Sequence, residues 1–234
     1  MRHPDEEQGA PRLPCRRGLW CGVLALLALA SGARGQQSPE QRERTLDVIK
    51  LLGGRVVFGE KGFDRPIIRV DLNGPRVTDD GVSSLRGFIL LQTLFLCETK
   101  VTDAGLANLR DLKDLRVLYL TYSAITDRGL EQLSGLDRLE ELGLSYTDIT
   151  DASLARLAKF KKLRTLALSH TAITDAGLEH LKKLKLEVLY LDGTLITKAG
   201  LEHLKEMPLQ MLSYSGTKAA ADGVDGFRKK PATP

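Results

Sequence analysis

The sequence contains few cysteines, and their positions leave little scope for disulfide bonds. Of the three cysteines, Cys15 and Cys21 stand close to the N-terminus and Cys97 stands alone. If residues 1–35 are cleaved as a signal peptide, which their sequence predicts as described below, the mature chain keeps one thiol and can form no intramolecular disulfide. Its stability must then come from a packed core. A lone thiol without a basic neighbour is usually inert, and we expect this of Cys97.

A strong imbalance of charge is also absent. The chain has 34 Lys+Arg against 30 Asp+Glu and a formal net charge of +4, which argues against nucleic acid as a partner. The clearest basic tract covers residues 159–164 and 182–185. We interpret it as a solvated face, with binding to an anionic surface as the alternative.

No apolar run is long enough to cross a membrane. The run from Gly18 to Ala30 has thirteen residues, or about 20 Å of helix against a hydrocarbon core of about 30 Å. Arg16 and Arg17 precede this run and small residues follow it, which is the order found in a signal peptide. We therefore predict a signal peptide over residues 1–35, an exported protein and no stable membrane span after cleavage. Two cleavage sites fit, after Ala30 or after Gly35.

Motifs for catalysis and for phosphate binding are missing. The patterns H-E-x-x-H, G-x-S-x-G and G-x-x-x-x-G-K-[ST] do not occur. The best candidates for metal ligands are the pairs Glu179–His180 and Glu202–His203, which occupy the same place in two neighbouring GLEHLK segments. Duplication of that segment explains them without a metal. We expect no catalytic residue, no metal site and no cofactor.

The chain is instead dominated by a tandem repeat. Six units follow one another without a gap, the first four of 24 residues and the last two of 23. They begin at Val77, Val101, Ile125, Ile149, Ile173 and Ile196.

Each unit combines two apolar periodicities. Leu118 and Leu120 alternate with polar residues at period 2, which predicts a strand, whereas Leu106, Leu109 and Leu112 recur every three residues, as on one face of a short helix. A unit this small cannot bury its apolar face alone. The units must therefore stack, strand beside strand, at about 4.8 Å per unit.

The unit pattern resembles the leucine-rich-repeat family. Each copy contains L-x-x-L-x-L-x-x-T-x-I/V preceded by T-D-x-G-L-x-x-L. The T-D-x-G-L segment is similar to the subclass of repeats found in F-box receptors and in many secreted bacterial repeat proteins. The resemblance covers about residues 67–218. It implies an α/β solenoid, a horseshoe with a parallel concave sheet and short convex helices.

Two polar columns run through the units. Five aspartates stand just ahead of the helical segments, where they could cap backbone N–H groups rather than bind cations. They are Asp79, Asp103, Asp127, Asp151 and Asp175, with Lys198 in the last unit. A second column should turn inward and satisfy backbone groups at the bend. It consists of Thr99, Ser123, Thr147, Thr171, Thr194 and Thr217.

The flanks of the array, residues 36–76 and 219–234, are expected to act as caps. Ser38 and Gln41 have the spacing of a capping box, and the helix that they begin should end before Gly53. Residues 55–58 and 66–72 should form a hairpin. At the other end the repeat decays after residue 218, and residues 228–234 are expected to be a disordered basic tail.

The strand face is the candidate binding surface, because the x positions of L-x-x-L-x-L point away from the core. All five tyrosines fall in the L-x-x-L-x-L-x-x segments of the six units. Exposed aromatic residues are typical of protein-binding patches. We expect a depression floored by Gly143 and Ala167, with Tyr119, Tyr146 and Tyr190 as anchors. The full candidate set is Phe95, Tyr119, Tyr122, Gly143, Tyr146, Ala167, His170, Tyr190 and Asp192.

Taken together, these observations predict an exported, non-enzymatic module that binds a protein partner through its concave face. A binder of envelope polysaccharide is the first alternative, because rows of tyrosine also suit sugars. An F-box-like recognition protein is the second, but no F-box-like helical segment precedes the repeats.

Overall fold

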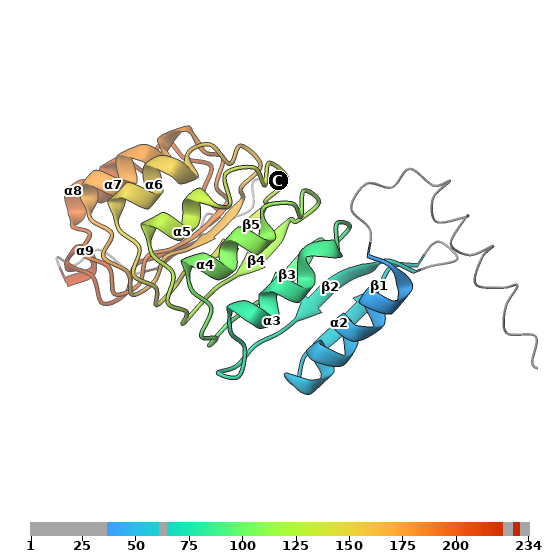
Figure 1. Cartoon of the computed structure of the whole chain (residues 1–234). Helices are drawn as coiled ribbons and strands as arrows, with labels where there is room; N and C mark the ends of the chain where they lie inside the picture. Colours follow the sequence, from blue (N-terminus) through green and yellow to red (C-terminus); the bar gives the residue numbers. More distant parts are fainter. Residues whose placement is uncertain (1–36, 61–64, 222–226, 230–234) are drawn as a thin grey trace, which may run out of the picture. The chain divides into compact units, whose positions relative to one another are not determined.

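The computed structural model describes residues 37–60, 65–221 and 227–229. The predicted signal peptide, with Cys15 and Cys21, lies outside these residues. The described residues of the unit from Gln36 to Pro234 form one repeat array (Figure 1).

A single sheet of nine strands runs through the described part of the chain in sequence order. The seven strands β2 to β8 are parallel. They are β2 (Ile67–Asp71), β3 (Thr93–Phe95), β4 (Val117–Tyr119), β5 (Glu141–Gly143), β6 (Thr165–Ala167), β7 (Val188–Tyr190) and β8 (Met211–Ser213). This is the parallel sheet of a leucine-rich-repeat solenoid, as the period of the sequence predicts, and it stays open.

Short helices connect the parallel strands and lie on one side of the sheet (Figure 1). The α-helices are α3 (Asp79–Ser83), α4 (Asp103–Leu106), α5 (Asp127–Glu131), α6 (Asp151–Leu157), α7 (Asp175–Leu178) and α8 (Lys198–Glu202). Three are followed by 3₁₀ turns, η1 (Ser84–Gly87), η2 (Ala107–Leu109) and η3 (Glu179–Lys183).

The core consists of the leucine positions of both halves of the unit. Strand leucines such as Leu118 and Leu142 and helix leucines such as Leu106 and Leu154 are at most 1% exposed. They belong to one continuous cluster. Tyr214 takes a leucine position in the last unit and is 3% exposed. It is therefore a core residue, whereas we expected all five tyrosines to lie on the exposed strand face.

The inward column of hydroxyls behaves as expected. Thr99 and the residues that follow it in the column are buried. Each hydroxyl donates to the carbonyl oxygen three residues earlier, at the bend after the strand. The column therefore satisfies backbone acceptors that the turn would otherwise leave buried without a partner.

The N-terminal flank covers the first unit. Helix α2 (Pro39–Leu51) begins at Ser38, whose hydroxyl accepts from the N–H of Gln41 while the Gln41 side chain accepts from the N–H of Ser38. Gly53 adopts a φ of 80° just after the helix, a conformation that favours glycine. Strand β1 (Arg55–Phe58) then pairs antiparallel with β2.

The C-terminal flank differs from our expectation of a disordered tail from residue 228 onward. A short helix, α9 (Lys218–Ala221), follows the last unit, and Phe227–Lys229 forms strand β9 antiparallel to β8. The reason is that β8 ends the parallel sheet and presents unpaired backbone groups, which an adjoining segment can satisfy. Residues 230–234 lie outside the described part.

Candidate functional site

The register of the sheet aligns one outward residue from each unit. The pairs Phe95–Tyr119, Tyr119–Gly143 and Gly143–Ala167 are direct neighbours across strands, and the alignment continues through Tyr190 to Ser213. We call these six positions the strand row. It has the order that the repeat alignment predicts.

A second outward row lies three residues beyond the strand row, at the turn after each strand. We call it the turn row. Its members are Gly74, Glu98, Tyr122, Tyr146, His170, Gly193 and Gly216. The N–H of each of the first six donates to a carbonyl of the following unit, for example Tyr122 to Ser145 and Tyr146 to Ser169. The turn row therefore continues the hydrogen-bond ladder of the sheet.

All seven residues of the turn row have a left-handed backbone. The three glycines have φ between 64° and 103°, and the four residues with side chains have φ between 55° and 59°. Among the described residues, Glu98, Tyr122, Tyr146 and His170 are the non-glycine residues with positive φ. A left-handed backbone costs a residue with a side chain about 1–2 kcal/mol relative to the right-handed conformation, so the fold favours glycine at this position.

The three rings of the turn row form a continuous stack. The ring centroids of Tyr122 and Tyr146 are 4.0 Å apart at an interplanar angle of 13°, and those of Tyr146 and His170 are 4.2 Å apart at 17°. The stack ends on Gly193, where an added Cβ would lie 2.5 Å from Nδ1 of His170. Tyr122 and Tyr146 remain 50% and 39% exposed, so the stack is a surface feature.

The strand row carries a second, shorter stack. The rings of Phe95 and Tyr119 are 5.3 Å apart at 16°. Beyond Phe95, the guanidinium of Arg69 lies 4.7 Å from the Phe95 ring centroid. Nε and one terminal nitrogen of Arg69 donate to the two carboxylate oxygens of Asp71 at 2.8 and 3.0 Å.

The expected depression over Gly143 is absent, and this part of our prediction is wrong. A Cβ added to Gly143 would lie 2.3 Å from Cδ1 of Tyr119, because the Tyr119 ring leans over the next unit and covers the glycine. Gly143 is buried. A glycine leaves room for the large ring of the neighbouring strand to lie over it, and Tyr119 fills that room.

The orientation of the Tyr119 ring also affects the hydrogen bonding and the pKa of its hydroxyl. Its hydroxyl donates to a carboxylate oxygen of Glu141 at 3.2 Å. Burial, together with the charge of Glu141, raises the pKa of Tyr119 to about 12, since both disfavour a phenolate. Tyr119 is thus half-buried and is fixed by its hydrogen bond to Glu141, whereas Tyr122 is more exposed.

The remaining candidate residues lie at the other end of the strand row. Ala167 and Tyr190 are direct neighbours across β6 and β7, and the Tyr190 hydroxyl donates to Sδ of Met211 at 3.3 Å. Asp192 accepts from the hydroxyls of Ser169 and Ser213 and from the N–H of Ser215. Asp192 is therefore committed to bonds within the chain.

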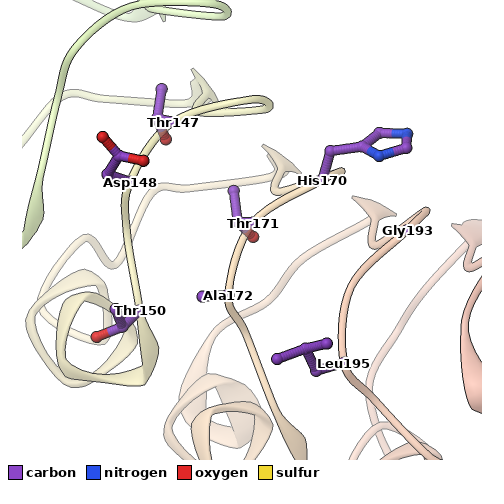
Figure 2. Close-up of a pocket in the computed structure, with 8 residues that line it drawn as sticks. All are labelled: Thr147, Asp148, Thr150, His170, Thr171, Ala172, Gly193 and Leu195. Atoms are coloured by element: carbon purple, nitrogen blue, oxygen red, sulfur yellow. The ribbon is translucent and has the colours of Figure 1, made fainter.

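Sequence reasoning missed a hollow beside the turn row. Figure 2 shows Ala172 between Leu195 on one side and Asp148 and Thr150 on the other, with His170 at the rim. Leu195 is 56% exposed and adds apolar surface to the hollow. The signal that could have revealed the hollow is the small Ala172 at the place where its neighbouring units have Asp148 and Leu195.

The aspartate column does not cap the helices as we expected. The caps are the preceding threonines, such as Thr126, whose hydroxyl accepts from the N–H of Arg128. Each aspartate instead bonds to the next unit: Asp103 accepts from both the N–H and the hydroxyl of Thr126. The same pair of bonds occurs for Asp79, Asp127, Asp151 and Asp175.

The position of each aspartate, turned toward the following unit, also explains the glycine in T-D-x-G-L. A Cβ at Gly105, Gly129 or Gly177 would lie 2.2–2.3 Å from Oδ1 of the aspartate in the preceding unit. In α6 the position is Ser153, and its hydroxyl donates to Asp127. The position thus accepts either no side chain or one that bonds to the carboxylate.

Within residues 37–60, 65–221 and 227–229, no group of three or more His, Cys, Asp or Glu side chains is placed to hold a metal ion. Burial raises the pKa of the Cys97 thiol, which lowers its nucleophilic fraction at neutral pH. Cys97 lies in the turn after β3 rather than in the strand.

A membrane-spanning helix is not found in the described part of the chain, since none there is both long and apolar enough. A comparison with curated proteins gave no match. Among solved structures, internalin C2 from Listeria monocytogenes is 19% identical, with a TM-score of 0.48 over 74% of this chain and 83% of that one.

Two family models match the repeat region. Both describe the leucine-rich repeat, one over residues 89–149 and the other over residues 161–182. These matches fall on the units whose strands, short helices and buried leucines are described above. The chain is therefore a leucine-rich-repeat protein.

Proposed function

We propose that this chain is an exported, non-enzymatic module that binds a protein partner through the outer face of its sheet and the adjoining turn row. The candidate surface comprises Phe95, Tyr119, Tyr122, Tyr146, His170 and Tyr190, with Gly143, Ala167 and Asp192 as supporting positions. Repeat arrays commonly use such an extended face for binding.

The observation that carries the proposal is the ring stack on left-handed turns. Tyr122, Tyr146 and His170 occupy positions where the last two units have glycine, and each retains a side chain at a cost of about 1 kcal/mol or more. Stacking offsets part of this, at about 0.5–1.5 kcal/mol per pair. The rings remain exposed and take no part in the core, and backbone strain kept on a surface is a reason to infer function there.

The geometry favours a protein over a polysaccharide. Sugars usually bind flat on an exposed ring face, but Tyr146 has one face against Tyr122 and the other against His170. Apart from one face of Tyr122, the stack presents ring edges and hydroxyls, beside the exposed Leu195. Such a mixture of apolar area and polar ends is typical of protein interfaces.

Export is the part of the proposal that depends on the sequence alone. Its basis is the order of basic, apolar and small residues over residues 1–35. Intact-mass measurement of protein from the extracellular or periplasmic fraction should give a start near Ser31 or Gln36. Recovery of the full-length mass from that fraction would contradict a cleaved leader.

The binding surface is tested by affinity capture from the envelope of the native cell. We expect Tyr146→Gly to weaken the captured partner's binding by about 2 kcal/mol, as for a central interface aromatic, while retaining the left-handed turn. Lys162→Glu, an exposed change outside the strand face, is the matched control. Loss of binding in the control but not in Tyr146→Gly would place the site elsewhere. Retention on isolated cell wall after high-salt washing would favour the polysaccharide alternative.

A further inference from the structure

We propose that the open face of Tyr122, together with Glu98, is a docking site for an arginine side chain of the protein partner. This inference rests on the proposed function and specifies the chemistry of the partner.

The first observation is that, among the described residues, no ring lies against one face of Tyr122. Its other face is covered by Tyr146 at 4.0 Å. The stack continues in that direction through His170 to Gly193, so the open face is turned toward the preceding unit, where Glu98 occupies the turn row. With Tyr122 50% exposed and Glu98 also exposed, this face is accessible.

The proximity of Glu98 and Tyr122 has an electrostatic signature. Hydrogen bonding to Tyr146 is the main cause that raises the pKa of Tyr122, and partial burial and the charges of Tyr146 and Glu98 add to it. Glu98 and Tyr122 are neighbours in the turn row, so the Glu98 carboxylate would also attract a cation that lies over the Tyr122 ring.

The second observation is that the strand row already contains such a docked arginine. Asp71 of β2 pairs with Phe95 at the start of the strand row, so the order across neighbouring strands is Asp71, Phe95, Tyr119 and Gly143. Arg69 lies over the first ring, 4.7 Å from its centroid, and makes two hydrogen bonds to the carboxylate of Asp71. The stack ends where Tyr119 covers Gly143.

The turn row repeats this arrangement with one component missing. Its order is Glu98, Tyr122, Tyr146, His170 and Gly193, again a carboxylate, stacked rings and a covering contact on glycine. In the part of the chain that the structure describes, no Lys or Arg forms an ion pair with Glu98. The cation that Arg69 supplies in the strand row has no counterpart in the turn row.

The surrounding charges favour a cation from outside. At the outward positions of β3 to β8 and in the two turn positions after each strand, the charged residues are Glu98, Glu141 and Asp192, with no Lys or Arg. The arginines of the adjoining row are paired, Arg116 with Glu140 and Arg164 with Glu187. These positions therefore carry negative charge only, with the exposed Lys100 two residues beyond Glu98, and they attract a basic segment.

Arginine suits the site better than lysine. A guanidinium is planar, so it can lie flat on the Tyr122 ring while its edge donates two parallel hydrogen bonds to Glu98. An ammonium cannot make both contacts in the same geometry. The Arg69 guanidinium combines the same two kinds of contact, with the Phe95 ring centroid at 4.7 Å and with both carboxylate oxygens of Asp71.

A selection from displayed random peptides against the purified protein tests the inference without a known partner. We expect the enriched peptides to share an arginine. In a synthetic copy, replacing that arginine by citrulline, which has the same shape and no charge, should weaken binding about tenfold. For the Glu98→Gln variant, replacing the arginine by citrulline should weaken peptide binding by less than about threefold, because the variant lacks the carboxylate charge that attracts the guanidinium. Glu206→Gln, an exposed carboxylate outside the strand face, should retain the full citrulline effect.

Three outcomes would overturn the inference. The first is enrichment of peptides without arginine, and the second is an equal citrulline effect on the original protein and on Glu98→Gln. The third is enrichment on Tyr122→Gly as strong as on the original protein. If a captured envelope partner requires Tyr146 but binds Glu98→Gln and the original protein equally, the proposed function stands and the arginine site does not exist.

Discussion

The carboxylate of Asp103 binds Thr126 of the following unit through two hydrogen bonds, from the backbone N–H at 2.8 Å and from the hydroxyl at 2.6 Å. Thr126 in turn caps α5 with the same hydroxyl oxygen. One side chain therefore links the stacking of two units to the start of a helix. Hydrogen bonds to a charged group contribute about 1.5–3 kcal/mol each, so this column adds to the cohesion that the core and the sheet provide between units.

Replacement of Asp127 by alanine should lower the free energy of unfolding by about 2–3 kcal/mol, because Thr150 and Ser153 lose their acceptor. Urea denaturation measures the change. Asp137→Ala is the control, since Asp137 is exposed and such changes usually stay within about 0.5 kcal/mol. Equal effects of the two substitutions would show that the inter-unit bonds contribute nothing.

The same aspartate should give stability a dependence on acid. Burial acts to raise the pKa of Asp127, but hydrogen bonds from Ser153 and Thr150 and the charge of Arg156 outweigh it, so the pKa is lowered. A lowered pKa stabilises the fold above the unfolded value of about 4, and this contribution is lost as the pH falls through the folded value. The difference in unfolding free energy between the original protein and Asp127→Asn should be constant from about pH 7 to 5 and shrink below about pH 4. A difference that does not change with pH would contradict the lowered pKa.

A side chain at Gly129 should disturb the same column. A Cβ there would lie 2.3 Å from Oδ1 of Asp103, and crowding of this kind costs about 1–3 kcal/mol. Gly129→Ser should cost less than Gly129→Ala, since the hydroxyl can donate to the carboxylate as Ser153 does to Asp127. Thermal unfolding of both variants tests the order, and a serine variant less stable than the alanine variant would reverse it.

Gly143→Arg should displace the ring of Tyr119, which occupies the space above the glycine. The pKa of Tyr119, about 12 in the folded protein, should then fall toward the ordinary value of about 10. Ultraviolet titration detects the phenolate, and Tyr119→Phe assigns the signal. Lys162→Glu should leave the titration unchanged. A Gly143→Arg protein in which Tyr119 still titrates near pH 12 would mean that the ring does not cover the glycine.

The sequence was sufficient to predict the features that depend on a repeated apolar pattern. Leu118 and Leu120 alternate because they lie in a strand, and a period of 24 residues places equivalent residues side by side. The start of α2 followed from Ser38 and Gln41. These features depend on local chemistry or on a period, and both can be read from the chain alone.

Features that depend on the direction of a side chain could not be predicted. An aspartate at the start of a helix can cap that helix or reach the next unit, and the two uses of Asp103 have the same sequence pattern. The repeat pattern places Gly143 beside Tyr119 but does not give the tilt of the Tyr119 ring, which covers the glycine. Tyr214 looked like its exposed counterparts by residue type, although its position was that of a core leucine.

The left-handed turns have a consequence for how this surface can change in evolution. Each ring rests on the unit that follows it, and each unit contributes one position to the row. Duplication or loss of a whole unit would therefore lengthen or shorten the stack by one rung and leave every other contact in place. A single substitution at a turn, between glycine and a ring, would move the end of the stack by the same step. The surface is thus assembled from interchangeable parts, so its reach can be altered independently of the core that carries it.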